Sequence, residues 1–250
     1  MTVTVSAPYL ADLGGLPFLD DGFAARRLLA VTAAVRYADA SRRGLADGMS
    51  PAQPGDWLSP ARAFMLSTAS TPMPALPLTT PRRRQLTGTL AALAAGMPSW
   101  RVLLALPVRY ARLSPANGAI SASSRDWPQH VLLAEEAFAT GRELAEQMLH
   151  ELAHQWLYLI DDIWPLQLPS ADTLTLPSGT RDRSPAEVLG AAHVAAVLTR
   201  FYRHDHSRWA AGRVRTLASY GTGCLDLAGT VNGDLTEAGT LIAQRLKEAF

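Results

Sequence analysis

One stretch of the sequence, TGRELAEQMLHELAHQWLYLIDD (residues 140–162), restricts the fold and the function more than any other. It predicts a single helix, because its apolar residues recur at helical spacing and Pro165 follows shortly after its end. The pattern His150-Glu151-x-x-His154 lies in its middle. Residues four apart project from the same face of a helix, so the two imidazoles can bind one metal ion. A largely apolar helix with this pattern on its central turns therefore predicts a metal centre.

Two histidines do not complete a catalytic metal site, which usually has three protein ligands and open positions. Two later residues, Glu187 and His193, are candidates for the third ligand. Glu187 closes a predicted capping box that begins at Ser184, so it already has a structural role. His193 lies in the middle of a helix among apolar residues, where an unpaired imidazole costs free energy. We therefore favour His193 as a ligand over the alternative of a satisfied core histidine.

Arg200 lies seven residues after His193, about 10 Å further along the same helical face. A guanidinium that reaches back toward the metal would bind the far carboxylate of a small diacid whose other end chelates the ion. An arginine near a helix end also interacts with the helix dipole at the surface. The residues alone leave both interpretations of Arg200 open.

Composition and charge exclude several classes of protein. The 250 residues are 48% hydrophobic and 18% charged, as in an ordinary globular protein, and the net charge of +1 gives no reason to expect a nucleic acid or an anionic membrane as partner. Cys224 is the only cysteine, which excludes an internal disulfide and a thiolate-rich zinc site. Without a recognisable secretory signal or an apolar run of about 20 residues, we expect a cytoplasmic protein.

The patterns along the chain predict an α+β fold, mainly helical, with a small antiparallel sheet beside the metal-binding helix. Further helices are predicted at residues 23–43, 61–68, 82–97, 184–206, 208–219 and 235–249. Short strands are predicted at residues 3–5, 102–106, 118–123 and 130–134, and a glycine-containing connection at 221–233. Residues 1–100, with a proline-rich loop at 50–81, are expected to form a mostly helical N-terminal region and residues 101–250 the catalytic region, within one compact unit.

The segments GAISASS, HVLLAEE, LAEQMLHELAHQWLYLI and RDRSPAEVLGAAHVAAVLTRFYR together resemble the HExxH-motif proteins encoded beside ribosomally made peptide precursors. Members of that family are known as iron(II)- and 2-oxoglutarate-dependent oxygenases that β-hydroxylate residues of those peptides in RiPP biosynthesis. The resemblance implies that His150, His154 and His193 hold iron and that Arg200 anchors 2-oxoglutarate, with a precursor peptide and dioxygen as the other substrates. Glu151 would then orient a ligand or a water molecule.

Two other functions remain open at this point. In a zinc metallopeptidase, Glu151 would deprotonate a zinc-bound water for attack on a peptide carbonyl. In a non-catalytic peptide-binding protein with a structural metal, chelation would cost folding stability and no metal would support turnover. Binding of 2-oxoglutarate that depends on Arg200 distinguishes the oxygenase from both alternatives. The sequence does not determine the oligomeric state.

Overall fold

The computed structural model describes residues 12–46, 54–67, 72–169 and 172–250, which pack as two compact units. Unit 1 is formed by Ile160–Phe250 with the described residues up to Ala24, and unit 2 by the described residues of Ala25–Leu159. The assignment of residues 1–100 to an N-terminal region and of residues 101–250 to the catalytic region stays a prediction. The strand predicted at residues 3–5 lies outside the described residues.

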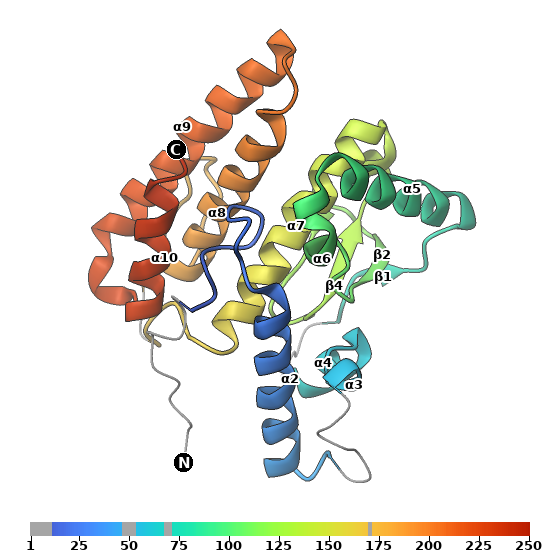
Figure 1. Ribbon diagram of the computed structural model, residues 1–250, viewed down its shortest axis with the longest axis vertical. Coiled ribbons are helices and arrows are strands. Elements are labelled where there is room, and N and C mark those ends of the chain that lie inside the picture. Colours follow the sequence, from blue (N-terminus) through green and yellow to red (C-terminus); the bar gives the residue numbers. More distant parts are fainter. Residues whose placement is uncertain (1–11, 47–53, 68–71, 170–171) are drawn as a thin grey trace. The chain divides into compact units, whose positions relative to one another are not determined.

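Unit 2 combines helices with a four-stranded sheet (Figure 1). Its helices and 3-10 turns are α2 (Ala25–Arg42), α3 (Pro54–Trp57), α4 (Pro60–Leu66), α5 (Thr80–Gly96), η1 (Pro98–Trp100), α6 (Arg101–Leu104), η2 (Glu135–Phe138) and α7 (Gly141–Asp161), the last of which continues into unit 1 from Ile160. Its strands are β1 (Ala75–Leu76), β2 (Arg109–Leu113), β3 (Ser121–Ala122) and β4 (His130–Leu133). The predicted fold class, mainly helical with a small sheet, is confirmed.

The sheet has the strand order β1-β2-β4-β3 and is mixed. The central pair, β2 and β4, runs parallel, whereas both outer pairs are antiparallel, so the expectation of a purely antiparallel sheet is wrong. The reason is the connection at 114–129, which is long enough for the crossover of a dozen or so residues that parallel strands require. All residues of β4 are buried, as expected for a central strand that is covered on both faces.

Alternate side chains of β4 join two separate apolar clusters. Val131 and Leu133 pack in one cluster with Leu144 and Met148 of α7. Leu132 belongs to the other cluster, which includes residues of β2. Since the first cluster joins sheet and helix, it fixes the strands beside the first half of α7.

The strand predicted at 102–106 is wrong. These residues lie in the turn of α6 and the bend after it, and the strand that follows begins only at Arg109. Pro98 opens a helical turn, and the buried side chains of Trp100, Leu103 and Leu104 follow helical rather than alternating spacing. A short apolar run such as this one fits both a strand and a helical turn, so its pattern alone does not distinguish the two.

A buried polar cluster links Gln129 to four other segments of unit 2. Gln129 is 1% exposed, and its side-chain amide donates to the carbonyl oxygens of Leu58 (2.5 Å) and Pro107 (2.6 Å). Its side-chain oxygen accepts from the Arg36 guanidinium of α2, and its backbone N–H donates to Gln155 Oε1 of α7 at 2.7 Å. Buried polar groups need such partners, so this cluster supplies the hydrogen bonds that loop ends would otherwise lack.

His130, at the start of β4, makes the stability of unit 2 depend on pH. Its ring is buried, lies 5.6 Å from that of Phe64 and has Nδ1 2.9 Å from Pro128 O. Burial lowers the pKa of His130 below its ordinary value of 6.5. The unfolded chain therefore takes up a proton before the folded chain does, and stability is lost as the pH falls from about 6.5 through the lower folded pKa.

We expect urea unfolding of His130→Gln to lose less free energy between about pH 7.5 and pH 5.5 than unfolding of the wild type, because glutamine does not titrate. His204→Gln, at an exposed position outside unit 2, is the matched control and should retain the wild-type pH dependence. Identical pH dependence in His130→Gln and wild type would contradict the prediction.

Unit 1 consists mainly of the helices α8 (Pro185–Tyr202), α9 (Arg208–Thr230) and α10 (Glu237–Lys247), with the 3-10 turn η3 (Asn232–Asp234). The three helices pack against one another (Figure 1). Helix α8 is buried over most of its circumference, as its apolar sequence predicts. Among the described residues, none of the helices combines the length and apolar character that crossing a membrane requires.

The connection predicted at residues 221–233 is wrong over most of its length, because these residues belong to helix α9. The helix continues through its glycines as far as Thr230. A Cβ on Gly221 would lie 2.0 Å from the ring of Phe250, so this glycine leaves space for an aromatic side chain. Packing against the C-terminal residue and α8 therefore offsets the cost of glycine in a helix, about 1 kcal/mol per residue.

Candidate metal centre

Helix α7 forms where the sequence predicts it. The Thr140 hydroxyl accepts a hydrogen bond from Glu143 N (3.0 Å), and the Glu143 carboxylate accepts one from Gln147 Nε2 (2.8 Å), one turn further on. The apolar side chains that recur at helical spacing are buried, among them Leu149, Leu152, Ala153, Trp156, Leu157 and Ile160. This burial fixes the rotation of the helix about its axis and thus the direction in which the motif residues project.

The two histidines of the motif lie side by side on one turn of α7. The ring centroids of His150 and His154 are 5.0 Å apart, and the ring planes meet at 62°. His150 has 39% of its side chain exposed and His154 is half-buried, so an ion can reach them from solvent. The His154 ring stacks at 5.9 Å on Tyr158, one turn later. The pair therefore has the spacing that shared metal binding requires.

Glu151 is fixed by a residue of the sheet. Its side chain is only 3% exposed, and Oε1 lies 2.6 Å from Ser121 Oγ on β3 and 3.9 Å from His150 Nε2. The same Ser121 hydroxyl lies 2.7 Å from Gln147 Oε1. A hydroxyl has one hydrogen, so it donates to one of these oxygens at a time. The contact sets the Glu151 carboxylate beside the histidine pair.

Replacing Ser121 with alanine should lower the free energy of unfolding by about 1.5–3 kcal/mol, the usual contribution of a hydrogen bond to a charged group. The loss arises because the buried Glu151 carboxylate would lose a donor. Chemical denaturation measures the change. Ser123→Ala is the matched control, since the buried Ser123 hydroxyl makes no hydrogen bond with the part of the chain that the structure describes. Equal losses in both variants would contradict the role of Ser121.

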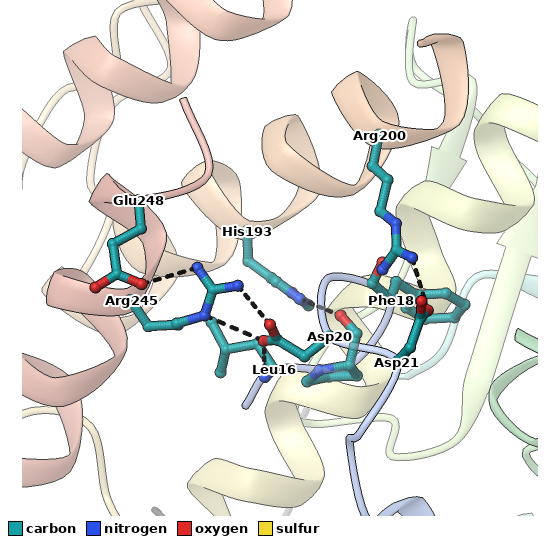
Figure 2. A network of polar contacts seen from close by, with 9 residues as sticks. Leu16, Phe18, Asp20, Asp21, His193, Arg200, Arg245 and Glu248 are labelled. Atoms are coloured by element: carbon teal, nitrogen blue, oxygen red, sulfur yellow. Dashed lines mark hydrogen bonds and ion pairs between the residues drawn. The ribbon is translucent and has the colours of Figure 1, made fainter. Parts of the chain in front are cut away.

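His193 and Arg200 lie in unit 1, where both contact the N-terminal loop (residues 13–22), as Figure 2 shows. His193 is fully buried, and its Nε2 is 2.9 Å from Pro17 O. Arg200 donates through Nη1 to Phe18 O at 2.9 Å and through Nη2 to Asp21 Oδ1 at 2.7 Å. The structure thus brings this pair together on one face of α8.

The contact with Pro17 determines which His193 nitrogen suits a metal. A carbonyl oxygen only accepts, so Nε2 carries the hydrogen in this contact. Metal-binding histidines commonly donate their other ring N–H to a backbone carbonyl. His193 therefore fits a metal through Nδ1 with Pro17 as the outer partner, whereas binding through Nε2 would break the contact.

Glu187, the alternative third ligand, is engaged at the start of α8. Ser184 N donates to Glu187 Oε2 (2.9 Å), and Arg183 Nη1 donates to Glu187 Oε1 (2.7 Å). The Ser184 hydroxyl completes the predicted capping box. Both carboxylate oxygens of Glu187 thus have donors that a metal would have to replace, which favours the histidine as third ligand.

The four residues predicted to bind the metal or 2-oxoglutarate fall into two pairs, one in each unit. His150 and His154 belong to unit 2, and His193 and Arg200 belong to unit 1. Among the described residues, no three or more His, Cys, Asp or Glu side chains lie close enough together to hold a metal ion. The structure therefore supplies a two-histidine site on α7, and the three-histidine set stays a prediction.

The single cysteine has no thiolate chemistry at neutral pH. Cys224 is fully buried in α9, and burial raises the pKa of its thiol to about 11. A buried thiol that is protonated at neutral pH is a poor nucleophile.

Sequence reasoning missed several residues of the site. Gln147 and Tyr158 lie at helical spacing from the motif, so this spacing was a signal for both. Ser121 and the N-terminal loop reach their partners only through the tertiary fold, and local spacing gives no signal for them.

Comparison of the sequence with models of known protein families and with curated proteins gives no match. The functional argument therefore depends on the residues described above.

Proposed function

We propose that this chain is an iron(II)- and 2-oxoglutarate-dependent oxygenase that β-hydroxylates a residue of a ribosomally made peptide in the cytoplasm. In this proposal His150, His154 and His193 hold the iron, and Arg200 binds the far carboxylate of 2-oxoglutarate. The observation that carries it is the pair of adjacent imidazoles on α7, with Glu151 fixed beside them. The engaged carboxylate of Glu187 supports a third histidine over a carboxylate.

Each residue has a separate task in the proposed reaction. When bound, the iron supplies the oxidising chemistry that no side chain can provide, with 2-oxoglutarate and dioxygen as co-substrates. One oxygen atom enters the peptide C–H bond, and the other enters the succinate left after 2-oxoglutarate loses carbon dioxide. The buried Glu151 carboxylate, fixed by Ser121, accepts a hydrogen bond and so orients a water molecule or a ligand beside His150.

Calorimetry with 2-oxoglutarate on the anaerobic Mn(II)-loaded protein tests the proposal. We expect binding that Arg200→Gln weakens strongly, because a guanidinium binds a carboxylate through charge-assisted hydrogen bonds. Incubation with iron(II), 2-oxoglutarate, dioxygen and the precursor peptide should give a product heavier by one oxygen atom with an intact backbone. Absence of 2-oxoglutarate binding to the metal-loaded protein would refute the proposal.

A zinc metallopeptidase is the second candidate, and one distance supports it. Glu151 Oε1 lies 3.9 Å from His150 Nε2, close enough to contact a water molecule on an ion held by that nitrogen. Peptide cleavage without dioxygen that Glu151→Gln abolishes would favour this function. An uncleaved peptide that carries an added oxygen atom would exclude it.

A further inference from the structure

The backbone of the N-terminal loop is a fixed part of the surface around α8. Its carbonyl oxygens at Pro17 and Phe18 accept hydrogen bonds from His193 and Arg200, each at 2.9 Å. Phe18 is fully buried with a φ of 64°, a conformation that costs free energy for a residue other than glycine. Strain of this kind persists where the surrounding structure imposes it. We therefore expect this backbone to remain in place when a ligand binds.

Asp21, in the same loop, contacts Arg200 through its side chain and not through its backbone. Its side chain is 67% exposed, and its Oδ1 lies 2.7 Å from Nη2 of Arg200, whose own side chain is 25% exposed (Figure 2). An ion pair with so exposed a partner contributes little to stability. The Asp21 carboxylate can leave Arg200 by rotation of its own side chain, while Phe18 O still holds Nη1 of the guanidinium.

We infer that Asp21 is a resident carboxylate, which an incoming dicarboxylate displaces from Arg200. This inference rests on the proposed function, which assigns Arg200 to the far carboxylate of 2-oxoglutarate. It adds a regulatory property: the chain competes with its own co-substrate for one guanidinium. The Asp21 carboxylate and the ligand carboxylate have the same charge and the same hydrogen-bonding geometry toward that guanidinium. The affinity for 2-oxoglutarate is therefore lower than an unoccupied Arg200 would give.

Calorimetry with 2-oxoglutarate on Mn(II)-loaded Asp21→Asn tests the inference. We expect the variant to bind 2-oxoglutarate about two- to fivefold more tightly than the wild type, the range that follows from the small energy of an exposed ion pair. The melting temperature without ligand should stay equal or fall slightly, since an ion pair is lost. A merely structural role for Asp21 would weaken binding and stability together, so opposite signs identify competition.

Glu248→Gln is the matched control. Glu248 is 70% exposed and forms an exposed ion pair of the same kind in the same unit, with Arg245 rather than Arg200, at 3.2 Å. Its removal should leave the affinity for 2-oxoglutarate unchanged. Asp21→Ser provides a second variant in case the asparagine amide keeps the contact with Arg200.

The possible failures of the two proposals differ. If the wild type binds 2-oxoglutarate through Arg200 but neither Asp21 variant binds it more tightly, the inference is overturned and the proposed function stands. If neither the wild type nor the Asp21 variants bind 2-oxoglutarate, the proposed function is wrong and the inference falls with it.

Discussion

Replacing His154 with alanine should weaken binding of iron(II) by more than about 100-fold. Loss of an outer partner of a metal ligand already costs about 10- to 100-fold, and the loss of a ligand itself should exceed this. The pair of imidazoles 5.0 Å apart would be reduced to His150 alone. Metal-dependent activity should fall at least in proportion. Anaerobic titration with iron(II) or Mn(II) measures the binding.

The fold should survive this substitution, because His154 is half-buried and its ring neighbours, His150 and Tyr158, lie on the same helix. A melting temperature of the metal-free variant close to that of the wild type would establish this. His204→Ala, at an exposed position, is the matched control and should bind metal like the wild type. Metal affinity that is unchanged in His154→Ala would rule out the metal centre on α7.

Replacing Gln129 with alanine should lower the free energy of unfolding by about 3–5 kcal/mol. The substitution removes one acceptor of the buried Arg36 guanidinium, which also donates to Trp57 O, and the donors for the carbonyl oxygens of Leu58 and Pro107. Neutral hydrogen bonds contribute about 1 kcal/mol each, and a hydrogen bond to a charged group contributes about 1.5–3 kcal/mol. Alanine, like glutamine, would have to adopt the left-handed backbone of this position, where φ is 57°.

Chemical denaturation of Gln129→Ala and Gln85→Ala tests this prediction. Gln85 is exposed on α5 and accepts from Arg82 at 2.6 Å, so its loss should change stability by less than about 0.5 kcal/mol. Similar values for the two variants would show that the buried cluster does not stabilise unit 2.

Helices with a clear start were predictable from the sequence. Ser184 and Glu187 predicted the start of α8, because a capping box is a local interaction between residues three apart. The predictions failed where tertiary packing decided the outcome. Gly221 continues a helix because Phe250, far along the chain, fills the space above it, and residues 102–106 avoid β structure because Trp100 and Leu103 are buried as parts of helical turns.

The candidate site follows the same division. The positions of His150, Glu151 and His154 on one helix were predictable, since helical geometry alone determines them. Ser121 was not predictable, because its contact with Glu151 exists only when β3 and α7 pack together. The partners of His193 and Arg200 come from a segment more than 170 residues earlier, and no local pattern indicates that pairing.

The N-terminal loop contacts α8 partly through backbone oxygens, and a hydrogen bond from Ala24 N, two residues after the loop, to Leu13 O (2.8 Å) holds its two ends together. A different side chain at Pro17 would leave its carbonyl in the same place. One residue inserted or deleted between Leu13 and Gly22 would instead shift the oxygens of positions 17 and 18 away from their donors at once. Homologous chains that keep this arrangement should therefore vary in residue type at position 17 while preserving the number of residues in the segment.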